Sequence, residues 1–133
     1  MTESELQIQV ADYIRMQYPD AMFHSDYGAG VKLTARQGAV QRRQNGGRKG
    51  WPDIFIAEPK LNGPIIQVKA GLFIELKREG TRLKKKNGEW ANNHIARQAE
   101  VLERLRFRDY SADFAVGFDE AKRIIDKYLG DIL

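Results

Sequence analysis

The N-terminal part of the chain has apolar residues at helical spacing. They recur every three or four positions between polar residues, at Leu6, Val10, Tyr13 and Ile14. Thr2 followed by Glu5 is the pattern of a capping box, in which a hydroxyl and a carboxylate satisfy the first N–H groups of a helix. The pattern therefore predicts an amphipathic helix over residues 3–18, which Pro19 ends.

Alternating and continuous apolar runs predict the strands. We expect a short strand at 21–25, strands at 53–57, 65–68 and 72–77 that form a hairpin or meander, and a strand at 113–118. Asn92 or Asn93 can cap a helix whose apolar face carries Ile95, Ala99, Leu102 and Leu105. Asp119 can cap a last helix with the apolar stripe Ala121, Ile124, Ile125, Tyr128 and Leu129. These elements predict an α/β fold of order α-β-β-β-α-β-α, as a single domain over residues 1–133.

Residues 27–50 show little periodicity. The segment contains the glycines Gly28, Gly30, Gly38, Gly46 and Gly47, with basic residues between them. We therefore expect a basic mobile loop that becomes ordered on its ligand.

The distribution of charge is more informative than its sum. The chain has 22 basic and 18 acidic residues, a net charge of +4. Yet 28–52 holds six basic residues and no acid, and 77–88 holds six against Glu79 alone. Each run by itself is compatible with a solvated loop. Two runs around an apolar block are typical of a polyanion-binding surface, so nucleic acid is the expected partner.

Composition excludes several classes of site. The 133 residues include no cysteine and only two histidines, which excludes disulfides, a thiol nucleophile and thiolate zinc sites. No apolar stretch approaches the roughly 20 residues that span a bilayer, and the acidic start does not fit a signal peptide. We expect a soluble protein of the cytoplasm that binds neither a membrane nor a nucleotide cofactor.

The chemistry-bearing residues lie on two strands. In 72–77, alternation places Phe73, Glu75 and Lys77 on one sheet face. Asp53 opens the earlier strand after Pro52, so neighbouring strands would bring Asp53 and Glu75 together around one hard cation, Mg²⁺ or Mn²⁺. A divalent metal ion beside a lysine is an arrangement typical of phosphodiester hydrolysis. The alternative is an exposed edge strand that merely carries alternating charge.

The sequence also resembles a nuclease family. Gly50-Trp51-Pro52-Asp53-Ile54 and Gly71-Leu72-Phe73-Ile74-Glu75-Leu76-Lys77 look like the PD-(D/E)xK signature. Gln98 with Leu102, a following strand, an Asp-Glu-Ala helix start and a closing Tyr-Leu resemble the virus-type replication-repair nuclease (VRR-NUC) domain, in its stand-alone phage and bacterial form. The resemblance extends from about residue 5 to residue 129.

The resemblance implies a restriction-endonuclease-like core, a central mixed sheet flanked by helices, and metal-dependent endonuclease activity on DNA. It further implies branched substrates such as Holliday junctions, a homodimer, and the cytoplasm of a bacterium or phage-infected cell. Asp53 and Glu75 would bind Mg²⁺ or Mn²⁺, Lys77 would be the catalytic lysine, and Gln98 a supporting polar residue. Glu5 would be a third ligand, with its role as capping acid and Glu3 as a substitute left open. Gln98 could equally be a core amide satisfied by backbone.

Other residues complete the expected interface. The nucleic-acid-binding residues are predicted to be Arg42, Arg43, Arg48, Lys49, Arg82, Lys84, Lys85 and Lys86. Trp90 is the favoured base-stacking residue, whereas Trp51 is expected in the core. His24 and His94 are expected to be structural or solvent-exposed. Two other functions stay open: a catalytically silent nucleic-acid-binding module, or an RNA-directed protein, on the same fold.

Overall fold

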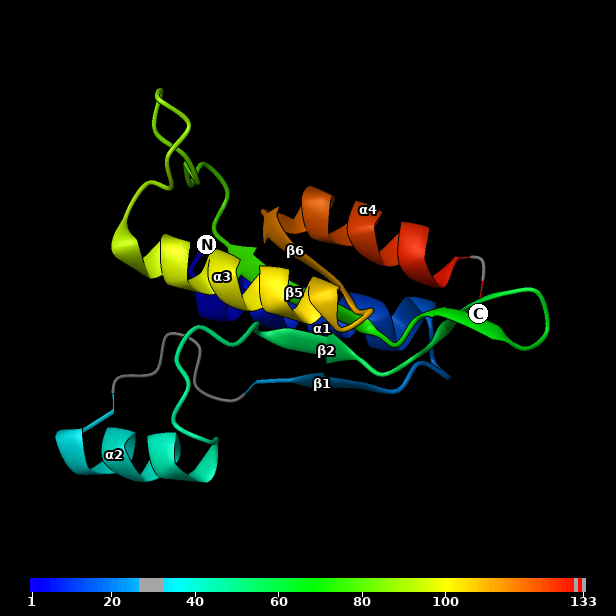
Figure 1. Ribbon diagram of the computed structural model, residues 1–133, viewed down its shortest axis with the longest axis horizontal. Coiled ribbons are helices and arrows are strands. Elements are labelled where there is room, and N and C mark those ends of the chain that lie inside the picture. Colours follow the sequence, from blue (N-terminus) through cyan, green and yellow to red (C-terminus); the bar gives the residue numbers. More distant parts are fainter. Residues whose placement is uncertain (27–32, 131, 133) are drawn as a thin grey trace.

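The computed structural model describes residues 1–26, 33–130 and 132 (Figure 1). In chain order the elements are α1 (Glu3–Gln17), β1 (Phe23–Ser25), α2 (Ala35–Gln44), β2 (Ile54–Ile56), β3 (Lys60–Asn62), β4 (Ile66–Lys69), β5 (Leu72–Lys77), α3 (Asn93–Phe107), β6 (Ser111–Val116) and α4 (Phe118–Leu129). Without α2 and the β3–β4 hairpin, this is the predicted order α-β-β-β-α-β-α.

The central sheet is mixed. Its strand order is β1-β2-β5-β6, with β1, β2 and β5 antiparallel in turn and β6 parallel to β5. The parallel pair requires a crossover, which α3 provides. The sheet and the helices packed on it match the predicted fold class.

Strand alternation divides the core between the two faces of the sheet. Ile54, Ile56, Leu72, Ile74 and Leu76 pack on α1 and α4 on one face. Phe55 and Phe73 point to the other face, where α3 packs. The alternation of side chains predicted for these strands is confirmed. Both β2 and β5 carry apolar side chains on each side, because both faces of the sheet are covered.

Helix α2 corrects the prediction of an irregular loop. Residues 35–44 form a helix that begins with a capping box of Thr34 and Gln37. The Ala, Arg and Gln residues favour a helix, but α2 buries no side chain, so hydrophobic periodicity could not reveal it. The predicted mobile loop also includes residues 27–32, which lie outside the described residues.

Two further boundaries differ from the prediction. Residues 60–62 and 66–69 pair with each other in a separate two-stranded sheet, so the stretch at 65–68 does not join the central meander. The N-cap of α4 is Gly117, at φ +85°, and Asp119 lies in the first turn. The carboxylate of Glu120 accepts the Val116 N–H instead. Thr2 and Asn92 cap α1 and α3 as predicted.

Gly71 allows β2 and β5 to pack closely. A Cβ at this position would lie 2.8 Å from the Ile56 carbonyl oxygen and 2.8 Å from the Phe55 ring. Such contacts are shorter than any side chain tolerates, so only glycine fits without moving β2.

None of the described helices is long and apolar enough to cross a bilayer.

Candidate active site

Asp53 and Glu75 lie opposite each other on neighbouring strands. Ile54 pairs with Ile74 in the antiparallel register, and continuing it by one residue sets Asp53 against Glu75. The Leu76 N–H donates to Oδ2 of Asp53 over 2.7 Å, which holds the Asp53 carboxyl group against the strand of Glu75. The predicted convergence of the two acids on one sheet face is therefore present.

Glu75 is surrounded by polar partners inside the protein. The side-chain amide of Gln98, from α3, donates to its Oε1, and the Lys77 ammonium lies 3.8 Å from the same oxygen. Glu75, Lys77 and Gln98 are exposed by only 4%, 6% and 6%. Charged side chains that are buried to this extent are rarely left without partners. Here Glu75 has Lys77 and Gln98 as its partners.

Burial shifts the protonation of both acids. Desolvation raises the pKa of Asp53, and the Leu76 N–H opposes this shift. Desolvation also raises the pKa of Glu75, the charge of Asp53 raises it further, and Lys77 opposes both. Two buried carboxylates that repel each other need a positive charge to ionise together, which is typical of functional sites.

The donor set fits a divalent cation. Oε2 of Glu75 and Oε1 of Gln98 are buried without a hydrogen-bond partner among the described residues. An unsatisfied buried carboxylate oxygen is costly, and a hard cation would satisfy it. The described residues contain no group of three or more His, Asp or Glu side chains placed to hold a metal. The site thus offers the carboxylates of Asp53 and Glu75, and further ligands would be water, carbonyl oxygens or one of the acids at the start of α1.

The two N-terminal acids have different surroundings. Glu5 is exposed, and its carboxylate accepts the Thr2 N–H over 3.0 Å in the capping box. Glu3 is partly buried, and its charge contributes to the raised pKa values of both Asp53 and Glu75. A cleft between the starts of α1 and α3 is lined by Glu3, Lys77 and His94. Of the two acids, Glu3 is therefore the one that the structure brings to the site.

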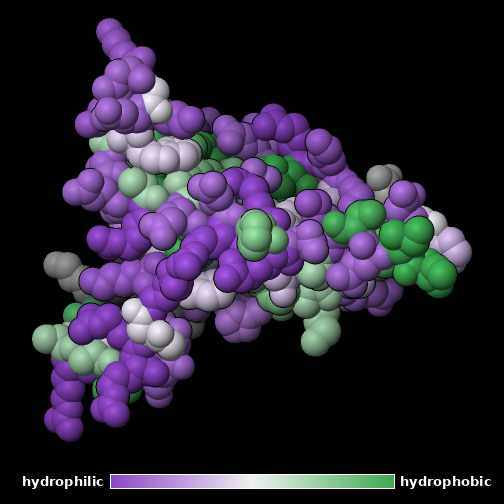
Figure 2. All heavy atoms as spheres, in the orientation of Figure 1, coloured by the Kyte–Doolittle hydropathy of each residue, from purple (hydrophilic) through white to green (hydrophobic). Residues whose placement is uncertain are grey.

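Two basic projections are attached at the site (Figure 1). The first is α2, with Arg42 and Arg43 in its last turn, followed by the exposed Arg48 and Lys49 that lead to Asp53. The second follows Lys77 and is a basic hairpin, residues 83–91, in which the Ala91 N–H donates to the Leu83 carbonyl over 2.8 Å. Arg82, Lys84, Lys85 and Lys86 are exposed on it or beside it. Figure 2 shows both projections as predominantly hydrophilic.

The structure corrects the predicted place of Trp51, while the stacking role of Trp90 stays a prediction. Trp90 is partly buried, 5.7 Å from Phe114 between ring centroids, and the Lys84 ammonium lies 4.7 Å from its ring. Trp51 was expected in the core but is 45% exposed, beside Asp53. Its exposure depends on which strands α3 covers, and a single sequence does not reveal this.

Both histidines are exposed, which is one of the two alternatives predicted for them. Sequence reasoning did not place either of them near the acids. The structure sets His94 in the cleft with Lys77, and desolvation together with the charges of Lys77 and Arg97 lowers its pKa. His24, on β1, pairs with Phe55 of β2.

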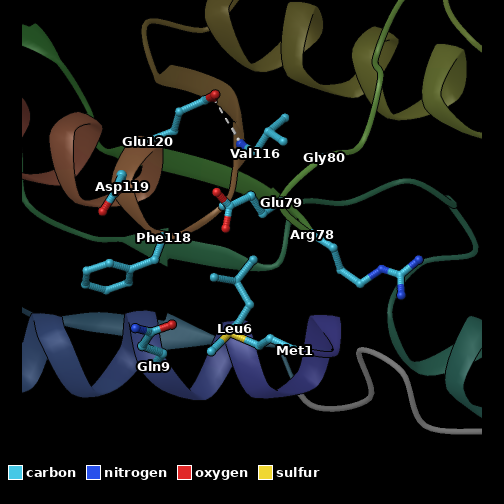
Figure 3. Close-up of a pocket in the computed structure, with 11 residues that line it drawn as sticks. Met1, Leu6, Gln9, Arg78, Glu79, Gly80, Val116, Phe118, Asp119 and Glu120 are labelled. Carbon is cyan, nitrogen blue, oxygen red and sulfur yellow. Dashed lines mark hydrogen bonds between the residues drawn. The ribbon is translucent and has the colours of Figure 1, made fainter.

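A larger cavity lies on the opposite side of β5. Its volume is about 600 Å³, and it lies between α1, the start of α4 and the segment after Lys77 (Figure 3). Glu79, Asp119 and Glu120 line it, with Arg78 the single basic side chain. Because three carboxylates repel phosphate, this cavity does not fit a nucleic-acid backbone.

Comparison with known proteins finds this fold in a solved structure. A chain described as "VRR_NUC domain protein" matches with a TM-score of 0.68 at 23% sequence identity, over 98% of this chain and 89% of that chain. The sequence matches no protein-family model, and it matches no curated protein at a significant level. The resemblance inferred from the motifs is therefore confirmed as a likeness of fold.

Proposed function

We propose that the protein is a divalent-metal-dependent endonuclease that hydrolyses phosphodiester bonds in DNA. The observation that carries the proposal is the cluster of the buried Glu75, Lys77 and Gln98 with the partly buried Asp53. This cluster has an unsatisfied carboxylate oxygen and lies at the end of the sheet where both basic projections begin. Fold likeness to a VRR_NUC domain protein supports the same conclusion.

Each residue has a distinct task in this proposal. Asp53 and Glu75 would hold Mg²⁺ or Mn²⁺, whose chemistry when bound is to activate water and to neutralise charge on the phosphate. Lys77 presents a compact positive charge that stabilises the negative charge developing on the phosphate oxygens. Gln98 orients the carboxylate of Glu75 by donating to one of its oxygens.

The basic projections would bind the DNA backbone. The exposed arginines and lysines of α2, of residues 48–49 and of the basic hairpin provide phosphate contacts, and each contact releases counterions. Because the projections are attached at Asp53 and at Lys77, DNA held by both would pass over this cluster. Two separate basic arms also suit a branched substrate such as a Holliday junction, whose arms diverge from one point.

We extend the proposal to a homodimer. Asp53, Glu75 and Lys77 form one site per chain, so cutting both strands of a junction requires a second copy, and a two-fold axis would supply it. The support for this step is the family resemblance together with this requirement.

The proposal is tested with four substrates and three metal conditions. Supercoiled plasmid, a four-way junction, a linear duplex and a structured RNA are incubated with Mg²⁺, Mn²⁺ or EDTA. We expect metal-dependent nicking of plasmid and faster cutting of the junction than of the duplex. Absence of metal-dependent cleavage of every DNA would refute the enzyme and favour the silent binding module. Cleavage confined to RNA would favour the RNA-directed alternative.

A further inference from the structure

One half of a sheet face beside the active site is only partly covered by the residues that the structure describes. Helix α3 packs on β6 and covers Phe73 of β5. Farther along the same face lie His24 of β1 and Phe55 of β2, which are paired across the strands. Phe55 is only partly buried and His24 is exposed. Phe55 packs against the cluster formed by Phe73 and α3, with its ring stacked 4.3 Å from the Phe73 ring between centroids, whereas His24 beyond it is exposed.

Trp51 stands at the edge of this partly covered face. It lines the same hollow as Asp53 and Phe55. The indole lies 6.0 Å from the Phe73 ring between centroids, at an interplanar angle of 54°. One side of the ring is thus supported by the core, while 45% of the residue remains exposed.

Polar groups border the same hollow. It has a volume of about 210 Å³, and His24, Asp26, Asn45 and Trp51 line it together with Asp53. The Asp26 N–H donates to the Asp53 carbonyl over 2.7 Å, which fixes this border to the active site. The hollow is smaller than the roughly 300–1,000 Å³ of a drug-sized pocket, so it suits one flat group with an aromatic face and a polar edge.

Charge indicates what that group belongs to. The exposed Arg48 and Lys49 come immediately before Gly50 and Trp51, and no acid occurs from residue 28 to residue 52. A ligand that reaches Trp51 along this segment therefore carries negative charge, and a nucleotide combines a phosphate with a flat ring. An aromatic side chain of a protein partner would not explain the basic approach.

We propose that Trp51 stacks on an unpaired nucleobase next to the scissile phosphate, with His24 and Asn45 at its polar edge. This inference rests on the proposed function and deepens it. Aromatic side chains stack on any base, but only on one whose face is free. Trp51 therefore favours substrates with an unpaired nucleotide beside the cut, such as branch points, over continuous duplex.

The test measures binding without cleavage, in EDTA. The chain has two tryptophans, so in the variant Trp90→Phe the emission comes from Trp51 alone. A fluorescent label on the DNA reports binding independently. We expect a short single strand to quench Trp51 emission, and a blunt duplex of the same sequence to bind without comparable quenching.

Variants in the wild-type background complete the experiment. Trp51→Ala should weaken single-strand binding by roughly tenfold and leave duplex affinity unchanged. Trp51→Phe should retain most of the affinity, which separates stacking from misfolding. Phe107→Ala is the matched control, because Phe107 is 86% exposed and lies at the far end of α3.

The outcomes separate this inference from the proposed function. Single-strand binding that leaves Trp51 emission unchanged, or equal affinities for Trp51→Ala and wild type, would overturn the stacking role while the nuclease proposal stands. If the wild-type chain binds no oligonucleotide at all, the stacking role is refuted, whereas the nuclease proposal is decided by the cleavage assay with Mg²⁺ or Mn²⁺.

Discussion

The side-chain amide of Gln98 in α3 donates a hydrogen bond to Oε1 of Glu75 in β5, with both residues buried. This bond fixes one carboxylate oxygen, while the other, Oε2, has no partner among the described residues. The carboxylate is therefore held in one orientation with its second oxygen available to a ligand.

Replacing Gln98 should weaken metal binding. Gln98→Leu removes the donor that orients Glu75, and the loss of such an outer partner typically lowers metal affinity by about 10–100-fold. Calorimetric titration with Mn²⁺ measures the change. Gln17→Leu is the control, because Gln17 is exposed near the end of α1. Unchanged affinity in Gln98→Leu would show that Gln98 is only a core amide.

Replacing Glu75 with glutamine should stabilise the metal-free protein. This gain in stability over the wild type should grow as the pH rises. The folded-state pKa of Glu75 is raised above the ordinary 4.5, chiefly by desolvation. Above pH 4.5 the unfolded chain releases this proton more readily than the folded chain, so wild-type stability falls until the raised pKa is passed. Glu75→Gln has no such proton and still accepts from Gln98.

Thermal unfolding in EDTA at pH 5 and pH 8.5 measures this effect. The Tm of Glu75→Gln minus that of wild type should be larger at pH 8.5. A matched substitution, Asp119→Asn at an exposed carboxylate, should show no such trend. A difference that shrinks with rising pH would contradict the buried, proton-retaining state of Glu75.

Removing Lys77 should separate cutting from binding. Lys77→Ala is expected to reduce cleavage of plasmid and junction below detection, because the positive charge beside Glu75 is lost. Junction affinity should change little, since binding depends on the dispersed surface basic residues. Gel-shift and nicking assays on the same preparations measure both, with the exposed Lys127→Ala as control. An equal loss of binding and cleavage would refute this division of roles.

Glu3 and Glu5 should respond differently to substitution. Mn²⁺ should raise the Tm of the wild-type protein, because a ligand that binds only the folded state stabilises it. Glu3→Gln should reduce this increase, since Glu3 acts on both acids of the site. Glu5→Ala should retain the increase but lower the stability by about 1 kcal/mol through loss of the capping box. The reverse pattern would assign the third ligand to Glu5.

Charge reversal on α2 should weaken DNA binding without altering the site. Arg42→Glu with Arg43→Glu removes two exposed cations. If both contact phosphates, the slope of log affinity against log salt should become less steep by about two. The matched pair Arg123→Glu and Lys127→Glu reverses exposed charges on α4. Equal effects of the two pairs would indicate nonspecific attraction rather than an interface on α2.

The pattern along the chain predicts the parts of the fold that bury side chains. Alternation in residues 72–77 correctly separates Leu72, Ile74 and Leu76 from Phe73, Glu75 and Lys77, because both faces of β5 are covered. The pairing of β2 with β5 had to be assumed, since residues 60–62 and 66–69 between them pair with each other in a separate hairpin.

What the pattern misses depends on features without a hydrophobic period. Helix α2 buries nothing, and its local signals were the helix-favouring Ala, Arg and Gln residues and the capping box of Thr34 and Gln37, within a glycine-rich segment. Glu3 lies near Asp53 and Glu75, and Trp51 is exposed, because of where the ends of the helices lie relative to the sheet. Such long-range geometry has no counterpart in residue spacing.

Gly71 makes the proposed activity sensitive to a position that takes no part in the chemistry. Because any side chain there would press on the Ile56 carbonyl and the Phe55 ring, it would force the strand of Asp53 away from the strand of Glu75. The distance between the two acids is thus set from the opposite end of β2. A protein altered at this glycine could retain its helices and its affinity for DNA while its two carboxylates stand too far apart to share one ion.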